Sequence, residues 1–193
     1  MIAQTETKSY TPEEYLELEV ACGTRNEYRD GEIVSMTGGT HNHNEIAGNL
    51  HTLLKFALKG QSYRIFIADQ RLWIPPVSLY TYPDMMVLPK PIELQTGRKD
   101  TVINPSFIAE VLSQSTQNYD RSEKFAAYRH IPTFQEYLLI DQYRIRVEHY
   151  VKTGVKQWIF SEYDDPNITL SFKTFELQIL IADLYENIDF TDQ

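Results

Sequence analysis

A short apolar run with one carboxylate inside it constrains the fold of this 193-residue chain more than any other feature. The run covers residues 107–112, Phe-Ile-Ala-Glu-Val-Leu, and lies between Pro105 and a polar turn at 113–116. Its length and apolar content predict a buried central strand. A glutamate such as Glu110 is costly inside such a strand unless neighbouring groups compensate its charge. We therefore expect a polar site around Glu110.

The segments on either side of this strand supply candidate partners for Glu110. A helix is predicted over 120–130, and Asp120, Lys124 and Tyr128 share one face of it because they are four residues apart. Asp120 is also expected to cap the start of this helix. Upstream, Asp84 follows a tyrosine and a proline and opens a second apolar strand at 85–88. Asp84, Glu110 and Lys124 together form a candidate divalent-metal site, since hard cations prefer oxygen ligands.

Each of these residues also has a structural interpretation. Asp84 alone is typical of a turn that leads into a strand. Lys124 alone is typical of a solvated helix lysine that pairs with Asp120. His43 begins the apolar stripe of a predicted helix, and a structural histidine is the favoured interpretation, with a supporting role at the site second. A zinc cluster with His41 and Glu45 is disfavoured, because no cysteine or histidine set has matching spacing.

The rest of the chain predicts an α/β (α+β) fold in which helices pack on a mixed sheet. Expected elements are a helix at 12–20, a hairpin at 25–36 with an Asp-Gly turn, a helix at 42–59, strands at 63–68 and 70–74, a polar loop at 89–104, a strand at 136–141, a hairpin of 144–151 with 155–160, strands at 168–172 and 177–181, and a helix at 182–187.

The expected organisation is a single domain over 1–193, which is long enough to bury a good core. We divide it into a flexible tail at 1–9, an N-terminal helix and hairpin at 10–40, a catalytic core at 41–141 and C-terminal hairpins at 142–193. Glu27 and Glu32 flank the turn of the N-terminal hairpin. Exposed or structural roles are favoured for both, with a contribution to the metal site as the alternative.

Charge and cysteine content narrow the classes of function. A net charge of −9 argues against a protein that coats nucleic acid, although an enzyme could still meet DNA locally through a metal and a few cations. The single cysteine, Cys22, leaves no internal disulfide and suits a reducing cytosol. No apolar stretch approaches the roughly 20 residues that span a bilayer, and no signal-peptide pattern opens the chain. We expect a cytoplasmic protein without a membrane partner.

The same residues carry a resemblance to a known family. Tyr82-Pro83-Asp84, the stretch 105–116 and the series Asp120, Lys124 and Tyr128 resemble the Uma2 family (DUF820), a group of proposed endonucleases of the PD-(D/E)xK superfamily. The resemblance covers roughly residues 10–150. It implies a restriction-endonuclease-like fold, with an αβββαβ core whose mixed central sheet is flanked by helices and extra β-hairpins.

The resemblance also implies roles for the candidate residues. Asp84 and Glu110 correspond to the metal ligands. The general superfamily pattern places a lysine at position 112, where this chain has Leu112. In proteins like Uma2 the lysine has moved to the following helix, which gives Lys124 here. His43, Glu32, Asp120 and Tyr128 are the candidate supporting residues.

The expected activity is Mg²⁺-dependent hydrolysis of DNA phosphodiester bonds, with Mn²⁺ as a substitute ion. Asp84 and Glu110 would hold the metal, a carbonyl such as that of Val111 would add an oxygen, and Lys124 would orient water or stabilise the developing charge. A homodimer is expected, because related nucleases often pair to cut both strands. Two alternatives stay open: a catalytically silent nuclease-fold binding protein, and a nuclease or phosphodiesterase that acts on RNA or nucleotides.

Overall fold

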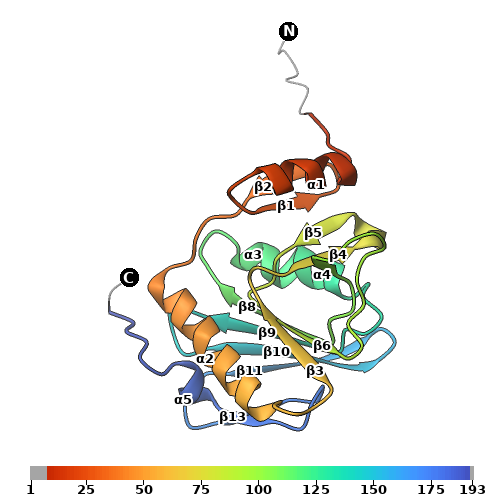
Figure 1. Cartoon of the computed structure of the whole chain (residues 1–193). Coiled ribbons are helices and arrows are strands. Elements are labelled where there is room, and N and C mark those ends of the chain that lie inside the picture. Colours follow the sequence, from red (N-terminus) through yellow and green to blue (C-terminus); the bar gives the residue numbers. More distant parts are fainter. Residues whose placement is uncertain (1–7, 192–193) are drawn as a thin grey trace.

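A six-stranded mixed sheet forms the centre of the fold in the computed structural model, which describes residues 8–191 (Figure 1). Its strand order is β11-β10-β9-β8-β6-β3. The bounds are β3 Tyr63–Ile67, β6 Met85–Pro89, β8 Phe107–Leu112, β9 Glu136–Asp141, β10 Val147–Gly154 and β11 Gln157–Tyr163. β8 and β9 are parallel, and the other neighbours are antiparallel. Every residue of β8 and β9 is buried, which confirms the predicted central strand around Glu110.

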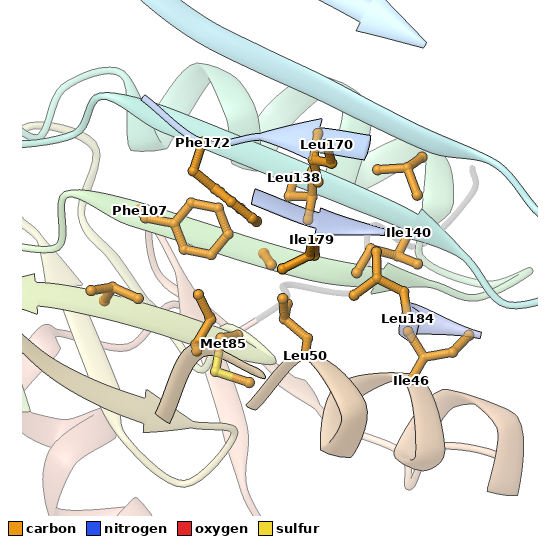
Figure 2. Close-up of a cluster of buried hydrophobic side chains, with 14 of the residues drawn as sticks. Ile46, Leu50, Met85, Phe107, Leu138, Ile140, Leu170, Phe172, Ile179 and Leu184 are labelled. Atoms are coloured by element: carbon orange, nitrogen blue, oxygen red, sulfur yellow. The ribbon is translucent and has the colours of Figure 1, made fainter. Parts of the chain in front are cut away.

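One face of this sheet is covered by α2 (His41–Ala57). Thr40 caps the helix by accepting a hydrogen bond from the backbone N–H of His43. Ile46, Leu50 and Leu54 then recur every four residues, so that they form one buried stripe. Figure 2 shows the side chains of Ile46 and Leu50 against those of the sheet and of the C-terminal segment. The helix thus forms as its apolar period predicts.

The other face is covered by a helical segment in three parts: α3 (Gln117–Tyr119), a π-helical turn η2 (Asp120–Lys124) and α4 (Phe125–Tyr128). The predicted helix at 120–130 is present, but the prediction that Asp120 caps it is wrong. The helical backbone begins three residues earlier, and Asp120 lies inside it with a buried side chain. A π turn adds one residue to a helical turn and is often found at functional sites.

This arrangement contains the expected αβββαβ core, which reads α2, β3, β6, β8, the segment 117–128 and β9. The predicted strand at 70–74 does not join that sheet. It becomes β4 (Arg71–Ile74) of a second sheet with the order β2-β1-β5-β4-β7. Its other members are β1 Asn26–Arg29, β2 Glu32–Ser35, β5 Leu79–Thr81 and β7 Thr101–Val102, and a 3₁₀ turn, η1 (Pro75–Val77), joins β4 to β5.

The N-terminal segment forms largely as predicted. A reciprocal capping box between Thr11 and Glu14 starts α1 (Pro12–Ala21). Asp30 and Gly31 have φ values of 43° and 102°, which the tight turn between β1 and β2 requires. The loop predicted at 89–104 is not structureless, because β7 lies in it and pairs in parallel with β4. Two residues are too few to give a strand signal in the sequence.

The C-terminal part completes the cover over the α2 face of the central sheet. β12 (Thr169–Ser171) and β13 (Gln178–Leu180) form a two-stranded hairpin, and α5 (Ile181–Leu184) follows it. The predicted terminal helix at 182–187 is therefore present but shorter. Of the predicted flexible tail at 1–9, residues 1–7 lie outside the described part of the chain. Within the described part, no helix is long and apolar enough to cross a membrane.

Candidate active site

The site forms where the start of β6 meets the end of β8. Asp84 immediately precedes β6, and the register that sets Met85 opposite Ala109 places Asp84 beside Glu110. The backbone N–H of Asp84 donates to Glu110 Oε2 at 3.2 Å, and the N–H of Val111 donates to Asp84 Oδ2 at 2.8 Å. Antiparallel pairing thus brings together two carboxylates that are 26 residues apart in the sequence.

Glu110 is 3% exposed and faces the helical segment 117–128. Its Oε1 accepts hydrogen bonds from Tyr128 Oη at 2.6 Å and from Lys124 Nζ at 3.1 Å. Burial raises the pKa of Glu110; Lys124 opposes this, while the charges of Asp84 and Asp120 add to it, so that the pKa lies above its ordinary value. The negative charge of Glu110 is therefore most stable when a proton or another cation compensates it.

Lys124 lies among three carboxylates. Its Nζ is 3.1 Å from Glu110 Oε1, 3.3 Å from Asp120 Oδ1 and 3.4 Å from Glu27 Oε1. Burial lowers the pKa of Lys124, but the charges of these three acids outweigh burial and hold it well above its usual range. The ammonium group is therefore charged. The alternative of a solvated surface lysine is wrong, because Lys124 is only 6% exposed.

Asp120 is also buried beside Lys124, at 2% exposure. Burial raises its pKa, and the charge of Lys124 opposes that effect without cancelling it. Although Oδ1 lies 3.3 Å from Lys124 Nζ, the two atoms are not aligned for a hydrogen bond, and within residues 8–191 Oδ1 has no hydrogen-bond donor. Asp120 therefore acts on Lys124 through charge.

Glu27, for which an exposed or structural role was favoured and a contribution to the site was the alternative, lies in the cluster around Lys124. It is 3% exposed on β1 and accepts hydrogen bonds from Thr81 Oγ1 and from Arg29 Nη2 at 2.6 Å. β1 has neighbours on both sides, β2 and β5, which places Glu27 in the interior of its sheet. Glu32 is exposed on β2, the edge strand, and makes no contact with the cluster. The exposed role favoured for Glu32 agrees with this position, whereas a supporting role at the site falls to Glu27.

His43 approaches Asp84 from the first turn of α2. Its Nε2 lies 3.1 Å from Asp84 Oδ1, while Nδ1 is buried and has no partner among the described residues. Burial lowers the pKa of His43, but the hydrogen bond and charge of Asp84 outweigh this and raise it above its ordinary value. His41 and Glu45 do not form a metal cluster with His43. The described residues contain no group of three or more acids, histidines or cysteines placed to hold a metal ion.

The two carboxylates at the strand ends fit a hard divalent cation that keeps several of its waters. Asp84 Oδ1 and Glu110 Oε2 each accept one hydrogen bond, so each retains a lone pair for a cation. The Asp84 side chain is 19% exposed, which opens it to solvent. The cluster holds four carboxylates against the permanent cations Lys124 and Arg29, and this excess of negative charge favours a further cation.

A central mixed sheet between helices, with buried acids and a lysine at its end, makes this an α+β protein with a polar site at the strand ends. The fold is similar to the crystal structure of "a putative nuclease belonging to DUF820" from Anabaena variabilis. The TM-score is 0.74 at 21% sequence identity, over 92% of this chain and 98% of that one.

The chain belongs to the Uma2 family. The family model, described as "Putative restriction endonuclease", matches residues 12–182. Two uncharacterized proteins of Synechocystis sp. (strain ATCC 27184 / PCC 6803 / Kazusa) are similar to it over nearly their whole length. The protein sll1609 is 41% identical over 92% of this chain and 100% of its own length. The protein slr1290 is 34% identical over 93% of each chain.

Proposed function

We propose that the chain is a Mg²⁺-dependent endonuclease of the PD-(D/E)xK type that hydrolyses DNA phosphodiester bonds. The observation that carries this proposal is the convergence on Glu110: Asp84 N–H bonds one oxygen, and the buried Lys124 ammonium bonds the other. Leu112 occupies the position where the superfamily pattern has its lysine. The contact between Lys124 and Glu110 supports a lysine moved to the following helix, which keeps two acids and one cation together.

Asp84 and Glu110 are the residues that would hold the metal. Mg²⁺, or Mn²⁺ in its place, supplies a Lewis acid that polarises the phosphodiester and lowers the pKa of a coordinated water. His43 positions the Asp84 carboxylate through the contact between Nε2 and Oδ1. Tyr128 fixes the orientation of Glu110 through its hydroxyl.

Lys124 stabilises the negative charge that develops on the phosphoryl oxygens during attack by water. Three neighbouring acids keep its ammonium group protonated, so this role fits it better than that of a general base. Glu27 and Asp120 are positioning residues, because they hold the ammonium group near Glu110 and are themselves buried.

DNA is the proposed substrate, the cytoplasm the proposed location and a homodimer the proposed assembly. The family description and the fold support a nucleic acid as substrate. The net charge of −9 means that contact with DNA has to be local, through the metal and nearby cations, because the protein as a whole repels phosphate.

Nicking of supercoiled plasmid in Mg²⁺ or Mn²⁺ tests the proposal, with the wild type compared with Asp84→Ala. Asp164→Ala, which removes an exposed acid beyond β11, is the matched control. We expect metal-dependent nicking by wild type and control, and none by Asp84→Ala. Equal nicking by all three proteins would remove the site assignment.

Two other results would favour the alternatives. If no protein nicks DNA but calorimetry detects Mg²⁺ binding that Asp84→Ala lacks, then RNA or nucleotides become the substrate to test. If the wild type binds no metal, then the fold is retained for binding alone.

A further inference from the structure

The outer edge of β11 is an unpaired strand with exposed apolar side chains. β11 forms one end of the six-stranded sheet, and no strand among the described residues pairs with its outer side. Ile159 is 56% exposed and Phe160 is 51% exposed. As neighbours in a strand they point to opposite faces of the sheet, so that both faces are apolar at this edge. An edge of this kind is a template for another strand.

The other edges of the two sheets carry features that protect them, and β11 does not. β3, at the opposite end of the central sheet, carries Arg64 within a strand of five residues. In the second sheet β2 carries the exposed Glu32, and β7 has two residues. β11 has seven residues, no proline and no lysine, and its one charged residue, Glu162, already pairs with Arg146. Natural proteins commonly protect edges by shortness, charge or proline.

The order of residues along β11 is complementary to itself in the antiparallel direction. With a two-fold axis through Ile159, this residue faces its own copy. Trp158 then faces Phe160 of the second copy, Gln157 faces Ser161, and Lys156, in the turn before β11, faces Glu162. Aromatic residues therefore meet aromatic residues and opposite charges meet, which are the cross-strand pairs that stabilise sheets.

Neighbouring registers lose this match. An axis through Phe160 places Trp158 opposite Glu162, and an axis through Trp158 places Phe160 opposite Lys156. A two-fold axis that passes between two residues is ruled out as well. It would set a side chain on one face of the sheet opposite a side chain on the other face, whereas residues that face each other in an antiparallel pair lie on the same face.

We propose that β11 is the interface through which two copies of this chain form a homodimer with one continuous sheet. The two-fold axis stands perpendicular to that sheet and reverses the direction of the strands. The site at the start of β6 and the end of β8 therefore opens toward one end of the joined sheet, and its copy opens toward the other. Where the proposed nuclease function holds, the dimer then carries two independent sites that do not face one duplex together.

Sedimentation velocity of the full chain at micromolar to submillimolar concentrations tests the interface. We expect the wild type to be dimeric. Ile159→Lys and Ile159→Glu are each expected to be monomeric, because like charges would face each other across the axis. An equimolar mixture of these two variants is expected to recover dimers, since lysine then faces glutamate. Phe56→Lys, which replaces an 85% exposed residue on α2, is the matched control and should stay dimeric.

A monomeric wild type would overturn the proposal, and so would a dimeric Ile159→Lys. Dissociation of Phe56→Lys would show that general apolar exposure, and not the β11 edge, drives association. A mixture of the two charged variants that stays monomeric would overturn the register. Circular dichroism checks the folding of each variant. If a charged variant at 159 unfolds, Lys156→Glu in the exposed turn replaces it, and an unweakened dimer in that variant would also overturn the register.

Discussion

Replacing Lys124 by methionine should strongly destabilise the folded protein, because three buried carboxylates lose the cation that they share. Nζ lies 3.1 Å from Glu110, 3.3 Å from Asp120 and 3.4 Å from Glu27. At about 3.3 Å and an effective dielectric constant of about 20, each pair attracts by roughly 5 kcal/mol, much of which desolvation offsets. Loss of one partner from a buried ion pair costs about 3–5 kcal/mol, which is the loss that we expect.

Urea unfolding at neutral pH, followed by circular dichroism, measures this loss. In a thermal melt of a chain of this size, the same loss of stability lowers Tm by roughly 6–20 °C. The loss should shrink in acid, because protonated carboxyl groups no longer repel one another. Asp120→Asn in the same chain should recover part of the stability of Lys124→Met, since it removes one of the uncompensated charges. Lys152→Met is the matched control, because among the described residues Lys152 Nζ pairs with no acid and donates to a backbone carbonyl, that of Phe134, at 3.5 Å.

A loss below about 1 kcal/mol for Lys124→Met would refute the reasoning, because that is the range of exposed ion pairs. The same conclusion would follow if Lys152→Met lost as much stability as Lys124→Met. Lys124→Met could also lose much stability and lose still more when Asp120→Asn is added. That result would indicate that Asp120 stabilises the cluster by hydrogen bonding and not through the ammonium charge.

Three further predictions concern single side chains, two at the site and one, Glu136, in a separate buried contact with His149. Tyr128→Phe should cost about 1.5–3 kcal/mol in urea unfolding, because Glu110 loses a donor in a buried place; an unchanged midpoint would contradict this. Asp84→Ala should bind Mg²⁺ more weakly than the wild type in calorimetry, and an equal affinity would contradict its assignment as a ligand. Burial raises the pKa of Glu136, but a hydrogen bond from His149 and backbone N–H donors outweigh it and leave the pKa below its ordinary value. That carboxylate stabilises the fold above its ordinary pKa of about 4.3, and the stabilisation is lost as the pH falls through the lower folded value. Glu136→Gln should therefore lose most stability near neutral pH, and a difference from wild type that widens in acid would refute this sign.

Several parts of the fold and the site follow from local sequence patterns. The four-residue spacing of Ile46, Leu50 and Leu54 marks a helix wherever it lies, because the helical period is local. An apolar run bounded by Pro105 and a polar turn marks a buried strand, which requires that Glu110 have partners. The acids and the lysine of the site were predicted in this way, and the structure brings Asp84, Glu110 and Lys124 together.

Other parts depended on pairing between distant segments. Glu27 and Glu32 flank the turn of one hairpin and look alike in the sequence, yet only Glu27 is buried. The difference arises because β1 pairs with β5, a three-residue strand without a sequence signal of its own. The π turn at Asp120 likewise has no local sequence signal. The contacts around it come from distant strands: Tyr137 Oη donates to the Asp120 carbonyl, and Tyr128 donates to Glu110.

The sequence by itself determined the longer helices and strands, and it required a compensated charge at Glu110. The tertiary structure alone decided which further acid joins Lys124 and which strand is left as an open edge. The physical reason is the distance along the sequence over which each effect acts. Periodicity and turn chemistry act over a few residues, whereas the burial of a charge depends on strands that are paired across 54 residues, as the contact from Thr81 to Glu27 illustrates.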